Sequence, residues 1–334
     1  MATARLVLLC AAAAIAIASA AQAGPSGYHI TDRIAGPDGG WDYASYDASR
    51  DRVLVARTAS VTAVDLKTRA VNPAFATAAS GHAAFPVNGG KEVAITNGSA
   101  NTVTFVDAAT GALLATVATG NGPDDAVIEP KTGLLLVMDH KGGTVTLVDA
   151  KTHTAVGTIA VGGTLEAAAV DGKGRVFVNV EDKNQIAVLN IPGRKVTARY
   201  ELAGCEGPTG IAYAASDKLL ISSCDGVAEV VAADTGKVVR QIKIGDGADG
   251  VAYDAGRHLA FIPAGMAGTL SVISVAHGDA TLIDTVTTQK RARTLALDTV
   301  RSRVFLPVAK YVIPADGGRP PPTPGTFELL VVGK

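Results

Sequence analysis

Short apolar runs alternate with turns along nearly the whole chain, and the clearest copy of this pattern begins at residue 124. Its runs are DDAVIEP (124–130), LLLVMD (134–139), TVTLVD (144–149) and HTAVGTIAV (153–161), separated by turns built largely from Lys, Gly and Thr. Side chains alternate in TVTLVD as in a half-buried strand, whereas LLLVM is apolar throughout and suits burial on both faces. Each copy therefore predicts four short β-strands.

The pattern occurs seven times. Seven segments of seven residues align with one another, and their second residues lie 40 to 44 residues apart. The segments are WDYASYD from Trp41, GHAAFPV from Gly81, DDAVIEP from Asp124, LEAAAVD from Leu165, PTGIAYA from Pro208, ADGVAYD from Ala248 and ARTLALD from Ala292. This period, with four strands per repeat, is typical of propeller blades. The sequence predicts an all-β fold, a seven-bladed β-propeller.

The two ends of the repeat array predict how the ring closes. YHITDRIAG (28–36) resembles a fourth strand but precedes the first complete unit, and the last unit, from Ala292, has only three strands. The N-terminal strand should therefore join the C-terminal blade, which leaves no open sheet edge between the first and last blades. Residues 24–334 are expected to form one propeller domain.

The N-terminus carries the pattern of a secretory signal peptide. Arg5 precedes an apolar run from Leu6 to Ile17, and Ala21-Gln22-Ala23 provides the small residues that signal peptidase accepts. We expect residues 1–23 to be removed near Ala23 and the mature protein to be periplasmic or secreted. No later apolar stretch of about 18 residues predicts a membrane span, and we expect a monomer.

Two cysteines, Cys205 and Cys224, remain after the predicted cleavage. In an oxidising compartment such a pair favours one disulfide, although two separate buried thiols are the alternative. The formal net charge of −1 and the 4% content of aromatic residues argue against nucleic acid as a partner. No haem-attachment or zinc-ribbon spacing of cysteines is present.

The segment 92–130 resembles the YVTN-type β-propeller repeat. Ala94-Ile95-Thr96-Asn97 matches the Tyr-Val-Thr-Asn core, and a valine-rich strand, an Asp-x-x-Thr-Gly turn and a Gly-x-x-Pro turn follow it. The resemblance covers most of the mature chain and is weakest in the last unit. It implies an exported propeller, but it implies no particular activity, because one fold serves many functions.

The repeat also indicates where a ligand would bind. The turn into each innermost strand presents one residue near the channel axis, and repetition places all of these residues at one mouth. The predicted ligand-binding residues are Asp42, His82, Asp125, Glu166, Thr209, Asp249 and Arg293. An alternative is that the aspartates and the threonine only bond turn amides and that Arg293 neutralises its acidic neighbours.

Further candidates follow the second strands, whose turns should open on the same face. They include Asn97, Asp139 and Asp182, and in the last blade the turn expands into a proline-rich loop, 310–326, around Pro320. This loop is either a lid or docking arm or a solvated insertion. The remaining histidines (His29, His140, His153, His258 and His277) are scattered in the sequence, without metal-ligand spacing.

These observations favour an exported, non-catalytic binding or scaffold propeller that holds a peptide, protein or small polar ligand at the channel mouth. One alternative is a metal-assisted hydrolase, in which Glu166, Asp125 and Asp249 hold a hard divalent cation whose bound water attacks the substrate. Another is a partner subunit of a periplasmic oxidoreductase. No cofactor other than such a divalent cation is expected, and no residue is assigned a catalytic role.

Overall fold

A computed structural model describes residues 26–312 and 322–334 of the chain. The predicted signal peptide and its cleavage near Ala23 lie outside the described residues. So does Pro320, with most of the proline-rich loop. The described residues contain no helix long and apolar enough to cross a membrane.

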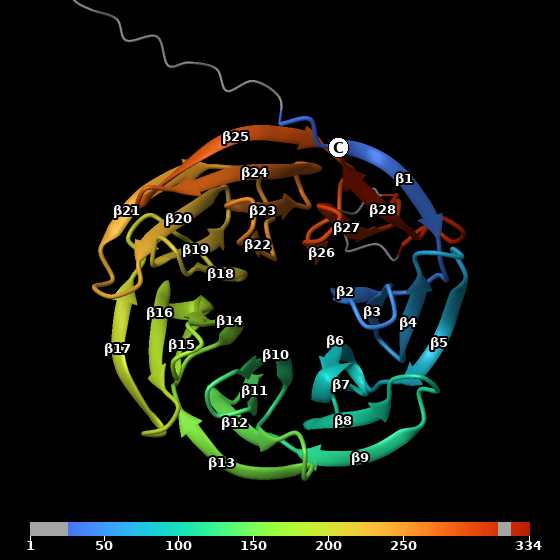
Figure 1. Cartoon of the computed structure of the whole chain (residues 1–334), viewed down its shortest axis with the longest axis horizontal. Coiled ribbons are helices and arrows are strands. Elements are labelled where there is room, and N and C mark those ends of the chain that lie inside the picture. Colours follow the sequence, from blue (N-terminus) through green and yellow to red (C-terminus); the bar gives the residue numbers. More distant parts are fainter. Residues whose placement is uncertain (1–25, 313–321) are drawn as a thin grey trace, which may run out of the picture.

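Seven four-stranded antiparallel sheets are arranged around a central channel, as Figure 1 shows. The predicted all-β, seven-bladed propeller is therefore confirmed. Six blades use four consecutive strands each and the seventh joins β26, β27 and β28 with β1, and the innermost strand of every blade lies beside the channel. We number the blades 1 to 7 in the order of their innermost strands.

The strands are grouped here by their position in the blade. The innermost strands are β2 (Trp41–Asp47), β6 (Gly81–Val87), β10 (Pro123–Glu129), β14 (Leu165–Val170), β18 (Ile211–Ala214), β22 (Ala252–Asp254) and β26 (Ala296–Asp298). The second strands are β3 (Arg52–Arg57), β7 (Glu92–Asn97), β11 (Leu134–Asp139), β15 (Arg175–Val180), β19 (Leu219–Cys224), β23 (Leu259–Ala264) and β27 (Arg303–Val308). The third strands are β4 (Ser60–Asp65), β8 (Thr102–Asp107), β12 (Thr144–Asp149), β16 (Gln185–Asn190), β20 (Val227–Ala232), β24 (Thr269–Ala276) and β28 (Glu328–Gly333). The outermost strands are β5 (Val71–Thr77), β9 (Leu113–Ala118), β13 (Thr154–Ala160), β17 (Lys195–Glu201), β21 (Val238–Lys243), β25 (Asp279–Thr287) and β1 (His29–Ala35). Two single-turn 3₁₀ helices, η1 (Asn88–Gly90) and η2 (Glu181–Lys183), follow β6 and β15.

The ring closes as the sequence predicts. Strand β1 pairs antiparallel with β28, so the last blade has the order β1-β28-β27-β26. The first strand of the domain therefore completes the blade that the end of the chain leaves open, as can be followed in Figure 1. Closure in this way pairs the edge that β28 would otherwise expose.

The core lies in the layers between neighbouring blades. Strand β11, the apolar run LLLVMD, is buried along nearly its whole length, as its lack of alternation predicts. The largest fully buried side chains include Phe105, Phe177, Phe261 and Phe305, which come from second or third strands of four different blades. The outermost strands are more exposed; β17, for example, alternates between exposed and half-buried positions.

Blade 5 contains a disulfide bond between Cys205 and Cys224, with a Cα–Cα distance of 5.3 Å. Cys224 ends the second strand of the blade, and Cys205 lies in the turn that leads to its innermost strand. The predicted pairing is therefore confirmed in the structure.

Candidate functional site

The innermost strands of blades 1 to 4 begin with the same irregularity at the mouth of the channel. In each, regular pairing with the second strand is interrupted between the first and the fourth residue of the strand. The interruptions lie between Trp41 and Ala44, Gly81 and Ala84, Pro123 and Ala126, and Leu165 and Ala168. Bulges of this kind redirect side chains at the ends of strands. The second residues of these strands are Asp42, His82, Asp124 and Glu166.

This register corrects the sequence alignment in blade 3, where we expected Asp125 at the mouth. Strand β10 begins at Pro123, so Asp124 is the residue equivalent to Asp42 and His82. Asp125 instead lines two smaller cavities, of about 170 and 130 Å³, with residues that follow the mouth positions in their own strands. Burial there raises the pKa of Asp125 to about 7. Asp125 therefore lies in the channel but outside the mouth.

One cavity of about 490 Å³ occupies the mouth. Five of the predicted residues line it, as does Asp124; these six are Asp42, His82, Asp124, Glu166, Asp249 and Arg293. Thr209 is not part of the lining, and its hydroxyl donates a hydrogen bond to the Ala248 carbonyl at 3.1 Å. Blade 5 therefore contributes no predicted residue to this cavity. The hydroxyl of Thr209 bonds a carbonyl that precedes the innermost strand of blade 6, and not the turn amides that the alternative expected.

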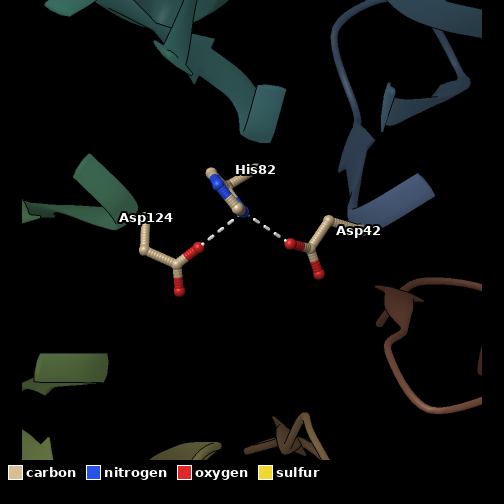
Figure 2. Close-up of side chains that lie close together, drawn as sticks. All are labelled: Asp42, His82 and Asp124. Atoms are coloured by element: carbon tan, nitrogen blue, oxygen red, sulfur yellow. Dashed lines mark hydrogen bonds and ion pairs between the residues drawn. The ribbon is translucent and has the colours of Figure 1, made fainter. Parts of the chain in front are cut away.

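Acidic and basic groups alternate around the part of the mouth that blades 6, 7, 1, 2 and 3 form. The Arg293 guanidinium donates to the carboxylates of Asp249 and Asp42, the latter at 3.1 Å. On its other side Asp42 lies 2.7 Å from Nδ1 of His82, and the same nitrogen lies 2.9 Å from Oδ1 of Asp124. Figure 2 shows His82 between the two aspartates. The blades are thus linked across the mouth by ion pairs between side chains.

His140 extends this arrangement to blade 4. It follows strand β11, and its carbonyl accepts a hydrogen bond from the amide of Leu165, the residue that begins β14. Nδ1 of His140 then lies 3.0 Å from Oε1 of Glu166. The sequence did not indicate His140 as a site residue, because its spacing to the other histidines is not that of metal ligands. One signal could have identified His140. The turns after the second strands were expected to open on this face, and Asp139, the residue before His140, was a candidate for that reason.

The two histidines at the mouth are held in their charged form. Hydrogen bonds to Asp124 and Asp42 raise the pKa of His82 to about 10, and the hydrogen bond to Glu166 raises the pKa of His140 to about 8. Burial raises the pKa of Glu166 to about 7, against the effect of His140. Desolvation therefore raises the pKa of the carboxyl and lowers the pKa of the imidazole, whereas the attraction between the two groups has the opposite effect on each.

Tyr43 lies between the mouth and the deeper channel. It lines the large cavity and both smaller ones, and its hydroxyl is buried without a hydrogen-bond partner among the described residues. Burial and the nearby carboxylates raise its pKa well above the usual value, so the hydroxyl keeps its proton. A buried hydroxyl without a partner is costly, which makes Tyr43 a donor available to a ligand.

The residues proposed for a hard divalent cation (Glu166, Asp125 and Asp249) are not brought together in this cavity, because only Glu166 and Asp249 line it. The described residues do contain two other groups that could hold a metal ion. Asp42, His82 and Asp124 form one, and Asp124, His140 and Glu166 form the other; in each, the ligand atoms lie within 4.8 Å of one another.

Comparison with known proteins supports the fold. No family model matches the chain, and no curated protein matches it. Among solved structures it is similar to a chain of the mitotic checkpoint complex, with 13% identity, a TM-score of 0.74 and coverage of 99% of both chains. It is also similar to a chain of hydrazine synthase from Kuenenia stuttgartiensis, with 13% identity, a TM-score of 0.69, and coverage of 80% of this chain and 92% of that one. At this identity the likeness shows the propeller fold and no activity.

Proposed function

We propose that this protein is a non-catalytic binding propeller that holds a positively charged ligand at the mouth of its channel. The ligand is a cation, or the cationic group of a peptide, a protein or a small polar molecule. The observation that carries the proposal is the convergence of carboxylates on one cavity. Asp42, Asp124, Glu166 and Asp249 all line it, and they come from four different blades.

The four carboxylates of the cavity are matched by Arg293, Lys141 and the two charged histidines. A positive ligand would therefore bind by taking the place of the protons on His82 and His140, which leaves the carboxylates as its partners. The side chains of Asp42 and Asp249 are 18% and 23% exposed, so a ligand can reach them, while the surrounding protein screens their field less than bulk water does.

The same residues support binding rather than nucleophilic catalysis. Ser80 and Ser99 also line the cavity, but in the described part of the chain neither is hydrogen-bonded to a histidine that could act as a base. Both histidines of the cavity bond to carboxylates instead. A nucleophile needs an adjacent base to be activated, and this arrangement supplies none.

Export to the periplasm or outside the cell is part of the proposal, and the disulfide between Cys205 and Cys224 supports it, because disulfides persist in oxidising compartments. The chain is proposed to act as a monomer of the YVTN-type group, on the motif at 94–97. A protein partner is consistent with the fold, since one similar chain belongs to the mitotic checkpoint complex.

Isothermal titration calorimetry of residues 24–334 tests the proposal, with a lysine-rich peptide, an otherwise identical glutamate-rich peptide, and calcium and zinc ions as probes. We expect the basic peptide or an ion to bind and the acidic peptide not to bind. Asp249→Asn should weaken binding of the basic peptide. Asp279→Asn, which removes an exposed partner of Arg240 far from the mouth, is the matched control. If no positive probe binds, or if both variants behave alike, the proposed function is wrong.

A further inference from the structure

The strongest unexplained feature of the mouth is the environment of one nitrogen atom. Nδ1 of His82 lies 2.7 Å from Oδ2 of Asp42 and 2.9 Å from Oδ1 of Asp124. An imidazole nitrogen carries at most one proton, so it can donate one good hydrogen bond, yet two carboxylate oxygens converge on it. Figure 2 shows that the three side chains approach one point from three blades.

These separations are those expected of ligands around a metal ion. Bonds of about 2.1 Å at right angles place neighbouring ligand atoms about 3 Å apart. In the first group Nδ1 is this close to both carboxylate oxygens, and the three ligand atoms all lie within 4.8 Å of one another. A doubly charged ion that binds as Nδ1 releases its proton to solvent would satisfy all three atoms together, which one proton cannot do.

A second group of the same composition adjoins the first. His140 lies 3.0 Å from Glu166, and both belong with Asp124 to a group whose ligand atoms lie within 4.8 Å of one another. Asp124 is common to the two groups. The cluster therefore offers two imidazoles and three carboxylates, with one carboxylate placed to serve both sides.

The cavity of about 490 Å³ leaves room for an ion beside the cluster, and two of its residues support the site. The buried hydroxyl of Tyr43 lines the same cavity without a partner, and it could donate to a ligand carboxylate or to water on the ion. Gly98 also lines the cavity, and a Cβ atom there would lie 2.6 Å from Nε2 of His82. Any larger residue at position 98 would displace the imidazole, so this glycine is required for the position of His82.

We infer that the cluster of Asp42, His82, Asp124, His140 and Glu166 binds a divalent transition-metal ion of the zinc or manganese type. Imidazole nitrogen mixed with carboxylate oxygen suits these ions, whereas calcium and magnesium prefer oxygen alone. The inference rests on the proposed function and specifies its cationic ligand. Arg293 and Asp249, on the other side of Asp42, are not assigned to the ion.

Protein stripped with a chelator and titrated with Zn²⁺, Mn²⁺ and Ca²⁺ in a calorimeter tests the inference. We expect Zn²⁺ or Mn²⁺ to bind at least about tenfold more tightly than Ca²⁺. His82→Gln and Asp124→Asn should each weaken this binding by at least about tenfold. His153→Gln is the matched control, because His153 also pairs with a carboxylate, that of Glu92 at 2.8 Å, but lies outside the cavity.

A second measurement keeps the test valid if a variant folds poorly. Co²⁺ added to the unmodified protein should give the absorption bands of a bound ion with nitrogen and oxygen ligands, and Zn²⁺ should displace it. The inference is overturned if the ions do not bind, or if binding is the same in His82→Gln, Asp124→Asn and His153→Gln. Binding of the basic peptide without zinc or manganese would overturn the inference and leave the proposed function standing.

Discussion

The two ends of the innermost strands carry acidic residues in several blades, but the two sets behave differently. At the end away from the mouth, Asp47, Glu129, Asp254 and Asp298 close their strands and are at most 1% exposed. They accept hydrogen bonds from backbone amides of the turn that follows; Asp298, for example, bonds the amides of Val300 and Arg301 at 3.0 and 3.1 Å. At the mouth, the carboxylates bond side chains of other blades and line an open cavity.

This difference shows that a repeated carboxylate is not by itself a binding residue. A carboxylate whose oxygens are satisfied by the amides of its own turn stabilises that turn and has little capacity left for a ligand. By contrast, within residues 26–312 and 322–334 the carboxylate of Asp42 is paired with the partly exposed side-chain ends of Arg293 and His82. Partners of this kind can rearrange when a ligand arrives, whereas backbone amides cannot.

The largest effect is expected when one buried acid is removed at the end of the strands away from the mouth. Asp298→Ala leaves the amides of Val300 and Arg301 and the guanidinium of Arg303 without their acceptor. We expect this to lower the free energy of unfolding by about 3 kcal/mol, because the loss of one buried carboxylate leaves several hydrogen-bond donors without an acceptor. Chemical denaturation followed by circular dichroism measures the loss.

Asp249→Asn at the mouth is the matching variant, since its side chain is 23% exposed and its removal leaves Arg293 paired with Asp42. It should destabilise the protein clearly less than Asp298→Ala. Equal losses in the two variants would contradict the distinction between the two ends.

Blade 5 extends the comparison, because it has neither acid: Thr209 and Ala214 occupy the equivalent positions at the two ends of its innermost strand. Its disulfide joins residues separated by 19 positions. In the chain-entropy model, closing a loop of this size stabilises the fold by about 3 kcal/mol. We expect the Cys205→Ser, Cys224→Ser double variant to show a loss of this order in denaturant, or somewhat less. A double variant as stable as the unmodified protein would show that blade 5 does not depend on this bond.

Replacing Arg293 at the mouth should raise, and not lower, the affinity for a positive ligand. Arg293 pairs with Asp249 and Asp42, so Arg293→Gln frees two carboxylates for a positive ligand. We expect affinity for a basic peptide or a divalent ion to rise about tenfold, or roughly 1.4 kcal/mol. Calorimetric titration gives the affinity. Arg301→Gln, which removes the ion pair with Asp298 at the end away from the mouth, should leave the affinity unchanged.

The smallest effect we expect is a difference in the dependence of stability on pH. Burial would raise the pKa of Asp298, but hydrogen bonds from the Arg301 amide and from Arg303 outweigh it, so the folded pKa lies below 3.8. Burial raises the pKa of Asp249 above 3.8, despite the attraction of Arg293. The lowered pKa stabilises the fold above pH 3.8, and this contribution disappears as the pH falls through the folded value. The raised pKa has the opposite sign, because the folded protein then binds the proton more tightly than the unfolded chain, so its contribution decreases as the pH rises past 3.8.

Thermal melts between about pH 6 and pH 3 compare the two carboxyls directly. Asp298→Asn should reduce the loss of melting temperature on acidification, whereas Asp249→Asn should slightly increase it. The same change of slope in both variants would mean that the two carboxyls do not differ in the way their surroundings indicate.

Much of the fold follows from the period of the sequence. The apolar runs and their spacing predict seven blades of four strands, the extra N-terminal strand predicts the closure, and the two remaining cysteines predict the disulfide. These features depend on local alternation and on how often it recurs, both of which are visible in the chain itself. Five residues of the predicted mouth also follow from the repeat, because equivalent positions in a closed ring lie around one axis.

The choice between Asp124 and Asp125 was beyond the repeat pattern, since two adjacent aspartates align almost equally well and only strand pairing decides which of them occupies the bulge. His140 was also missed, because its contact with Glu166 depends on a turn of blade 3 meeting the first residue of β14 in blade 4. The sequence by itself thus determined the number of blades, their order and the position of the mouth. The tertiary structure decided which acids pair with which histidines, because those pairs join different blades over distances of about 3 Å that no spacing along the chain encodes.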